Sequence, residues 1–295
     1  MTRITFDKFN ENNLRLFILS SARNESYWPK TALAQTVTWL NSDDPLNRRF
    51  AYILNAANGA VYGSNMGMPF WVMVDCGLMP GGYFGVMGPA KLLPPKLRAL
   101  IDDNLAIMQP PSGTQGESLQ APLTDDEIIP LAESCAIPAT EDKTVIAYSL
   151  YSLVPGLGVI AKAAMLSAYR KMGLKYQIGI GQFDNPSFRI HTRFGALEIL
   201  NFSVPLHSLA HKTLYYRLTI PSEKDLQKIV RGETEIFRAR NTPEQIPCDH
   251  HVRRETFNAR RAAGTHQYYL VAPGLDTKAQ NNFILEVANK TRTKK

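Results

Sequence analysis

Two glycines placed between a predicted strand and a predicted helix are the residues whose spacing points most directly to chemistry. Gly156 and Gly158 follow an apolar run over 143–153 and precede a helix pattern over 159–172. The first N–H groups of a helix lack intrahelical partners, the helix dipole favours negative charge there, and glycine lets an anion approach the main chain. The joint therefore predicts an anion site that a pyrophosphate would fit, with a purely structural glycine turn as the alternative.

Side chains able to move protons or to act as nucleophiles are few and scattered. Asp75 ends a predicted strand and is a candidate base, the alternative being a solvated carboxylate at a strand end. Cys76 beside it is interpreted as a small core residue rather than a nucleophile. His191 is a candidate proton donor because imidazole titrates near neutral pH, with a structural histidine as the alternative.

Metal binding is not expected from the spacing of the histidines and cysteines. His207 and His211 are four residues apart in strand-like surroundings, where side chains at that spacing do not converge. The remaining group does not match an established ligand framework for zinc: Cys248, His250, His251 and His266.

The elements that must position these residues are predicted from hydrophobic periodicity and turn residues. Helices are expected over 10–25, 31–40, 96–108, 159–172 and 186–194, and strands over 49–55, 71–76, 143–153, 175–181, 197–204 and 213–220. Beyond Pro221 we expect two polar, Arg-rich helices, a strand and a final amphipathic piece. This order predicts an α/β fold, a mixed central sheet flanked by helices.

Charge is unevenly distributed along the chain. Residues 101–142 hold nine Asp and Glu and no Lys or Arg, so the other 253 residues carry 33 basic and 17 acidic groups. The segment 77–142 is interpreted as a long acidic insertion or lid, with a flexible excursion as the alternative. Residues 1–220 are then the core and residues 221–295 a basic C-terminal extension. The excess of basic groups outside residues 101–142 is expected to attract anionic partners by long-range steering. The alternative is a solvated basic surface without a partner.

Length and composition exclude several classes of protein. The chain has 295 residues, of which 44% are apolar and 20% charged, which is typical of a folded globular protein. No run of eighteen apolar residues occurs, so no membrane span is expected. The first residues, MTRITFDKFNENN, lack an apolar leader region, and three widely spaced cysteines predict no disulfide, so the expected location is the cytoplasm.

The stretch over 144–196 resembles the acyl-CoA N-acyltransferases of the GNAT superfamily, and a weaker likeness extends over roughly 10–220. The likeness is carried by the glycine pair, by the helix that ends at Gly173, and by Asn185 before a short predicted helix. The resemblance implies that several of these residues bind acyl-CoA. The strand backbone of Tyr148 and Ser149 would pair with the pantetheine, and Asn185 would orient the pantetheine. The pyrophosphate would lie at the start of the helix, on Gly156, Leu157, Gly158, Val159 and Ile160.

Two departures from the family pattern change these expectations. Leu153 stands where the family has Gln or Arg, so anion binding would fall to the backbone and to Lys162. The family often has a tyrosine near the end of the short helix that protonates the leaving thiolate. His191 or Thr192 takes that place here, and the spacing is one residue short.

The resemblance implies transfer of an acyl group from acyl-CoA, or from acyl carrier protein, to an amine by direct attack. Acyl-CoA is then the cosubstrate, no metal takes part, Asp75 accepts the amine proton, and His191 or Thr192 protonates the thiolate. The alternative is a non-catalytic GNAT-like protein whose basic extension binds nucleic acid or another acidic partner. Arginine pairs after residue 237 favour phosphate contacts, but few aromatic residues accompany them, and a solvated helix face is the third interpretation.

Overall fold

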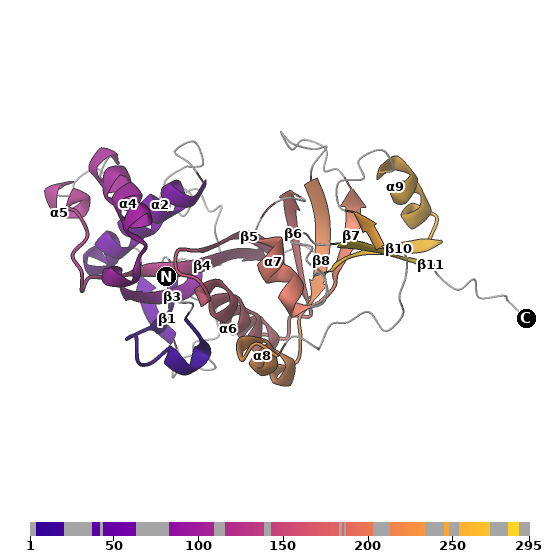
Figure 1. Cartoon of the computed structure of the whole chain (residues 1–295), viewed down its shortest axis with the longest axis horizontal. Coiled ribbons are helices and arrows are strands. Elements are labelled where there is room, and N and C mark those ends of the chain that lie inside the picture. The colour runs from indigo at the N-terminus through magenta and orange to yellow at the C-terminus, as the bar shows by residue number, and fades with distance from the viewer. Residues whose placement is uncertain are drawn as a thin grey trace, which may run out of the picture. The chain divides into compact units, whose positions relative to one another are not determined.

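The computed structural model describes residues 4–20, 37–41, 44–62, 83–108, 116–138, 143–182, 185, 187–202, 213–233, 245–247, 254–271 and 283–288 (Figure 1). The chain divides into two compact units. Unit 1 comprises Met1–Pro138 and Tyr148–Gly173, and unit 2 comprises Ala139–Ala147 and Leu174–Lys295. Each unit has its own helices and its own stretch of sheet, so the two are described in turn.

Unit 1 is built on a mixed sheet with the strand order β2-β1-β3-β4-β5. These strands are β1 (Arg15–Ser20), β2 (Val37–Asn41), β3 (Tyr83–Pro89), β4 (Ile128–Pro138) and β5 (Thr144–Ser152). β1 runs parallel to β2 and antiparallel to β3, and β3 runs antiparallel to β4. The strand that carries the predicted anion loop, β5, therefore lies next to β4 in this sheet.

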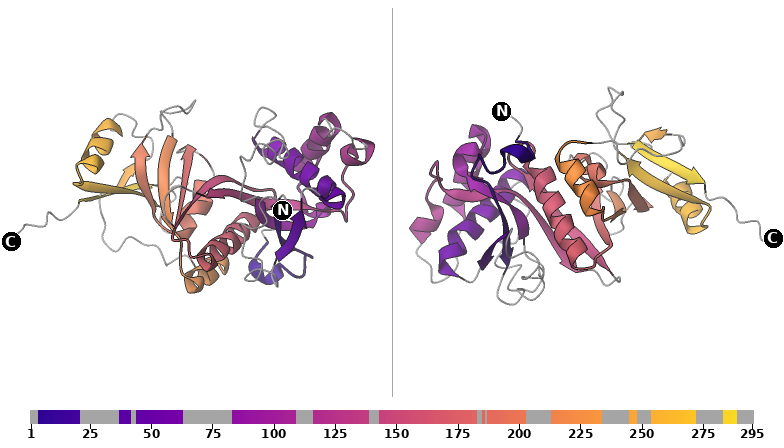
Figure 2. Two further views of the ribbon diagram at one scale, coloured as in Figure 1. Left: turned by 180° about the vertical axis from the view of Figure 1, so that it is seen from behind. Right: turned by 90° about the horizontal axis from the view of Figure 1, so that it is seen from below.

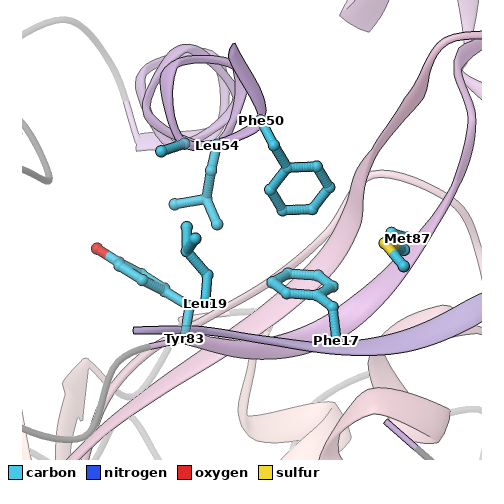
Figure 3. Close-up of a cluster of buried hydrophobic side chains, with 7 residues drawn as sticks. Phe17, Leu19, Phe50, Leu54, Tyr83 and Met87 are labelled. Carbon is cyan, nitrogen blue, oxygen red and sulfur yellow. The ribbon is translucent and has the colours of Figure 1, made fainter. Parts of the chain in front are cut away.

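Helices cover both faces of the unit 1 sheet (Figure 2). On one side lie α2 (Arg48–Tyr62), α4 (Pro95–Ile107) and the short α5 (Gly116–Gln120), and on the other lies α6 (Leu157–Lys171). Figure 3 shows the core beneath α2, where the Phe17 ring meets the edge of the Phe50 ring at 4.9 Å between centroids, with Leu19, Leu54 and Tyr83 around them. Apolar side chains from α2 and from two strands thus fix this helix on the sheet.

Part of residues 77–142, the segment interpreted as an insertion or lid, forms regular elements of unit 1. Within this segment β3 and β4 occupy the middle of the unit 1 sheet, so its described part belongs to the core. Two of its carboxylates form ion pairs: Glu127 pairs with Arg49 at 2.9 Å and Asp126 with Lys91 at 2.7 Å. Asp102 accepts a hydrogen bond from the Leu123 N–H. The acidic composition is therefore matched by basic side chains that the sequence places outside residues 101–142.

Unit 2 includes the first residues of β5, and its strands have the order β5-β6-β8-β7-β10-β11-β9. Its strands are β6 (Tyr176–Gln182), β7 (Leu197–Phe202), β8 (Thr213–Thr219), β9 (Gln245–Pro247), β10 (His266–Val271) and β11 (Phe283–Ala288). β5 and β6 are parallel from Thr144↔Tyr176 to Ala147↔Gly179, whereas β6 and β8 are antiparallel. Three strands from beyond residue 221 extend this sheet, so the two units do not coincide with the predicted boundary at residue 220.

The described part of unit 2 contains the helices α7 (Phe188–His191), α8 (Glu223–Val230) and α9 (Arg254–Ala262). α7 continues into the 3-10 turn η5 (Thr192–Phe194). α9 is held to β7 by Asn258, whose side chain donates to the Phe202 carbonyl at 2.8 Å and accepts from the Phe202 N–H at 3.0 Å. The rings of Phe257, Phe202 and Tyr268 pack against one another beneath it. The Arg-rich C-terminal region therefore has a core of its own.

Most predicted elements from residue 96 onward are confirmed, whereas three nearer the N-terminus are wrong in the residues that the structure describes. The helix predicted over 10–25 contains the strand β1, and the strand predicted over 49–55 lies inside the 15-residue helix α2. The described end of the helix predicted over 31–40 belongs to β2. The strand predicted over 71–76 lies outside the described residues.

Candidate functional site

The loop between β5 and α6 needs glycine at its end. β5 ends at Ser152 and α6 begins at Leu157, with Gly156 directly before the helix. Gly156 has φ +99° and ψ −32°, a backbone conformation that a side chain would strain. The predicted strand, glycine loop and helix are therefore confirmed, and the glycine is required by the turn itself.

A serine at the end of β5 organises this loop. The Ser152 hydroxyl donates to the Val154 carbonyl at 2.8 Å, and its oxygen accepts from the Gly158 N–H at 3.0 Å. The Leu157 N–H donates to the same Val154 carbonyl at 3.2 Å. Two of the four N–H groups that a helix start leaves without intrahelical partners are thus engaged within the loop.

The donors left for an anion are fewer than the sequence predicts. Helix geometry directs the Ile160 N–H to the Gly156 carbonyl, and Leu157 and Gly158 are engaged as above. In the described part of the chain, neither the Gly156 N–H nor the Val159 N–H has a hydrogen-bond acceptor. The helix start therefore offers two backbone donors, supported by the positive end of a 15-residue helix.

The loop is fastened to the rest of unit 1 on both sides. The Leu153 N–H donates to the Leu131 carbonyl on β4 at 2.8 Å, and the Ile4 N–H donates to the Pro155 carbonyl at 2.9 Å. Leu153 is buried, so the residue that replaces the family's Gln or Arg packs in the core instead of facing a ligand. Pro155 is exposed and Gly156 half-buried, which makes them the solvent-facing part of the loop.

Lys162 lies one turn further along α6 and has no exposed surface. Burial lowers the pKa of its ammonium group to about 7, because removal from water disfavours the charged form. A wholly buried side chain does not reach the surface of the loop. The expected contribution of Lys162 to anion binding is therefore not supported, and the positive potential at the loop comes from the backbone and the helix dipole.

Asn185 lies two residues before Ser187, the N-cap residue of the short helix α7 in unit 2. Its Oδ1 accepts from the Ser187 N–H at 2.9 Å, and its carbonyl accepts from the Phe188 N–H at 3.1 Å. The carboxamide oxygen of Asn185 is therefore used by the chain itself, as is common for Asn at a helix start. A contact between this side chain and a ligand would fall to its Nδ2 group.

The two candidate proton donors on α7 and η5 have different surroundings. The Thr192 hydroxyl is buried and donates to the Phe188 carbonyl at 2.7 Å, so its proton is held inside the helix turn. His191 is buried to 5% exposure, and its Nε2 lies 3.4 Å from the Tyr216 hydroxyl on β8. Of the two, His191 has the better chemistry for proton transfer near neutral pH.

Tyr216 is the residue near this site that sequence reasoning missed. It lies 25 residues from His191, in a strand whose pattern marks it only as buried. The sequence of β6 gives a weak indication of a ring packed on this strand, because Gly179 and Gly181 alternate there with isoleucines. A Cβ at Gly179 would lie 2.6 Å from the Tyr216 hydroxyl, so this glycine leaves room for the phenol.

The remaining predicted site residues are placed only in part. Tyr148 and Ser149 follow Ala147 in β5, and Ala147 is the register partner of Gly179. Asp75 and Cys76 lie outside the described residues. Among the residues that the structure describes, no group of three His, Cys, Asp or Glu could hold a metal ion. In the same part of the chain, no helix is long and apolar enough to cross a membrane.

The aromatic residues near the Arg-rich helix α9 are committed to the core. Phe257 is 2% exposed and Tyr268 is fully buried, and both pack on Phe202. Stacking of nucleic-acid bases requires exposed ring faces. These two side chains therefore do not form a stacking surface.

No family model and no curated protein matches the sequence of this chain, whereas several solved structures are similar to it, three of which are acetyltransferases. A Desulfovibrio desulfuricans protein described as a GNAT-family acetyltransferase is 16% identical, with TM-score 0.34, covering 57% of this chain and 92% of that one. A Lactobacillus plantarum protein described as an N-acetyltransferase is 12% identical, with TM-score 0.34 and coverages of 60% and 94%. The ribosomal-protein-S18-alanine N-acetyltransferase of Escherichia coli is 14% identical, with TM-score 0.25 and coverages of 32% and 63%. These three structures are acetyltransferases of low identity to this chain, whose described part has a mixed α/β fold.

Proposed function

We propose that this protein transfers an acyl group from acyl-CoA to an amine. The observation that supports the proposal best is the loop between β5 and α6, where Ser152 holds the main chain so that the Gly156 and Val159 N–H groups remain as donors at a helix start. Two backbone donors and a helix dipole suit the pyrophosphate of coenzyme A. The buried histidine on α7 supplies a second group that the reaction needs.

The pantetheine arm is proposed to lie along β5. Its two amide groups can pair with the main chain of Tyr148 and Ser149 in the way that an extended peptide adds to a strand. These residues stand directly after the part of β5 that pairs with β6. A short step along the strand, at Ser152, begins the loop proposed for the pyrophosphate.

The reaction proposed is direct attack by a neutral amine on the thioester carbonyl. A C–N bond forms, the C–S bond breaks with its electron pair going to sulfur, the nitrogen loses a proton and the thiolate gains one. His191 is proposed to protonate the thiolate, and Asp75 to accept the amine proton. General acid and base assistance of this kind contributes about 10² to 10⁴ in rate, and positioning supplies much of the rest.

Thermal denaturation with coenzyme A, acetyl-CoA and a long-chain acyl-CoA tests the proposal. A ligand at 100 times its Kd stabilises the folded state by about 2.7 kcal/mol, which should raise the Tm by about 5 °C in a chain of this size. Pantetheine, which lacks the pyrophosphate, serves as the matched control and should give a smaller shift. Acetyl-CoA is then offered with a panel of small amines, and release of free thiol reports transfer.

Either of two results would count against the proposal. If no CoA compound shifts the Tm of a folded sample, acyl-CoA is not the donor, and acyl carrier protein becomes the donor to test. If coenzyme A binds but no thiol is released with any amine, the non-catalytic binding protein is favoured instead.

A further inference from the structure

The loop between β5 and α6 contains a tight turn whose central peptide can take two orientations. The Leu157 N–H donates to the Val154 carbonyl at 3.2 Å, which closes a four-residue turn with Pro155 and Gly156 at its centre. Gly156 has φ +99° and ψ −32°, close to the third residue of a type II turn, a turn that favours proline at the second position and glycine at the third. A type I turn would need a negative φ at Gly156. The two turn types differ mainly by roughly half a turn of rotation of the central peptide.

One hydrogen bond from outside the loop holds this peptide in its orientation. The Ile4 N–H donates to the Pro155 carbonyl at 2.9 Å. In a planar trans peptide, such as that between Pro155 and Gly156, the C=O and the N–H point in opposite directions. Because the Pro155 carbonyl is directed at Ile4, the Gly156 N–H is directed away from Ile4. The direction of one of the two donors proposed for the pyrophosphate is therefore set by the main chain of Ile4.

The segment that carries Ile4, residues 4–14, is folded on itself and is called the strap below. Ile4 and Leu14, at its two ends, are buried at 8% and 4% exposure. Between them lies the 3-10 turn η1 (Phe6–Lys8), and the Leu14 N–H donates to the Phe9 carbonyl at 3.3 Å. The Ile4 N–H is thus presented to the loop by a segment that has its own turns and hydrogen bonds.

The other end of the strap is fixed by the sheet of unit 1. Leu14 directly precedes β1, which lies between β2 and β3. A Cβ at Gly88 of β3 would lie 2.5 Å from the Leu14 side chain, so this glycine leaves room for the leucine on the sheet. The strap therefore connects the core of unit 1 to the Pro155 carbonyl.

We propose that Ile4 is a positioning residue for coenzyme A, its main-chain N–H holding the Pro155 carbonyl so that the Gly156 N–H is aimed at the pyrophosphate. This inference rests on the proposed acyl-CoA site, and the residues that carry it all belong to unit 1. Without this hydrogen bond the turn can take either orientation. In the other orientation the Pro155 carbonyl, an acceptor, points where the donor pointed, and an anion is not bound there.

The expected loss of affinity follows from the strength of one hydrogen bond. An intramolecular hydrogen bond of ordinary net strength favours one of two orientations by about 3- to 10-fold. A ligand that binds one orientation has an apparent Kd that rises as the population of that orientation falls. Loss of the bond from Ile4 should therefore weaken coenzyme A by about 3- to 10-fold. Pantetheine lacks the pyrophosphate and should bind as before.

Calorimetric titration of two variants separates the main-chain donor of Ile4 from its side chain. Ile4→Pro removes the N–H and should weaken coenzyme A about 3- to 10-fold, with pantetheine unchanged. Ile4→Ala keeps the N–H, loses most of the buried side chain, and is the matched control. It should be less stable than the wild type but bind coenzyme A within about twofold of it. Wild-type affinity of a folded Ile4→Pro protein for coenzyme A, or an equal loss in Ile4→Ala, overturns the inference.

Amide NMR of the wild type gives a readout that does not depend on whether Ile4→Pro folds. The chain has three Pro–Gly peptides, so labelling proline with carbon-13 and glycine with nitrogen-15 selects three amides, and Pro155→Ala identifies that of Gly156. We expect coenzyme A to shift the Gly156 amide signal. We also expect the Ile4 amide, identified with Ile4→Ala and nitrogen-15 isoleucine, to exchange with solvent more slowly than an unstructured amide. An Ile4 amide that exchanges at the unstructured rate overturns the inference.

The same measurements separate failure of this inference from failure of the proposed function. Coenzyme A that binds the wild type but leaves the Gly156 amide signal unchanged overturns the inference, while the proposed acyl-CoA donor stands. Absence of coenzyme A binding to the folded wild type overturns the proposed function and the inference with it.

Discussion

A lysine buried in the first turns of α6 should make stability depend on pH in a way that one substitution removes. Lys162 has no exposed surface, and burial lowers its pKa from 10.5 to about 7. Between these two pH values the unfolded chain binds a proton that the folded chain does not. Because the unfolded state binds more protons there, the free energy of unfolding rises with pH across this window.

The size of the effect follows from the pKa difference. Each pH unit within the window contributes about 1.4 kcal/mol, and the slope is halved at pH 7, where the folded group is half protonated. Raising the pH from 7 to 9 should therefore increase the free energy of unfolding by about 2 kcal/mol through this residue alone. Below pH 7 the contribution levels off, since the lysine is then protonated in both states.

Urea unfolding at pH 7, 8 and 9 measures the effect in the wild type and in Lys162→Met. The substitution keeps a long apolar side chain and should remove the rise of about 2 kcal/mol. Lys171→Met, at an exposed position of the same helix, is the matched control and should keep the rise. If Lys162→Met retains the wild-type slope, the lysine is not the buried, weakly basic group described here.

Two further predictions concern packing and ion pairing. Gly179→Ala places a Cβ 2.6 Å from the Tyr216 hydroxyl and should destabilise the protein by about 1–3 kcal/mol in urea unfolding; a change below 0.5 kcal/mol would mean that the phenol does not lie on β6 as described. Arg49→Met removes a half-buried ion pair with Glu127 and hydrogen bonds to two carbonyls, and should lower the free energy of unfolding by about 1–3 kcal/mol in the same assay. Lys91→Met breaks an exposed ion pair and should destabilise the protein clearly less than Arg49→Met does. Equal costs for the two basic residues would contradict this ranking.

The glycine loop and its helix were predictable because local signals agree there. An apolar run, two glycines, small residues at helical spacing and Gly173 at the end all indicate a strand, a turn and a helix, as observed. The hydrogen bonds of Ser152 were not predictable. They depend on how a side chain folds back over the turn, and they decide which N–H groups remain for an anion.

The errors near the N-terminus have a physical cause. Leu16, Phe17, Ile18 and Leu19 form a continuous apolar run, which fits a helix or a strand buried on both faces, and the sheet neighbours β2 and β3 decide between them. The segment over 49–55 is rich in aromatic and branched residues but lies in α2, where its buried side packs on the sheet. Tertiary packing outweighed local preference in both places.

The contact of His191 with Tyr216 shows why the surroundings of a candidate site residue are harder to predict than helices and strands. The two are separated by 25 positions and meet because β8 pairs with β6 beneath α7. No spacing rule within the sequence connects them. Only the glycine at position 179, which the phenol requires, leaves a trace of the contact.

The proposed pyrophosphate contact depends on the Val159 N–H, which one substitution removes cleanly. Val159 is the third residue of α6, where an N–H has no intrahelical partner, so proline takes away the donor without breaking a helix hydrogen bond. Val159→Ala keeps the N–H and is the matched control. A hydrogen bond to a charged group contributes about 1.5–3 kcal/mol, which corresponds to a Kd about 10- to 100-fold weaker.

Calorimetric titration of coenzyme A into the wild type, Val159→Pro and Val159→Ala, each checked for folding by circular dichroism, tests the central claim most directly. We predict that Val159→Pro weakens coenzyme A by about 10-fold or more and leaves pantetheine unchanged, while Val159→Ala binds both as the wild type does. Wild-type affinity of a folded Val159→Pro protein for coenzyme A, or no binding of coenzyme A to the wild type, would contradict the assignment of the pyrophosphate to this loop.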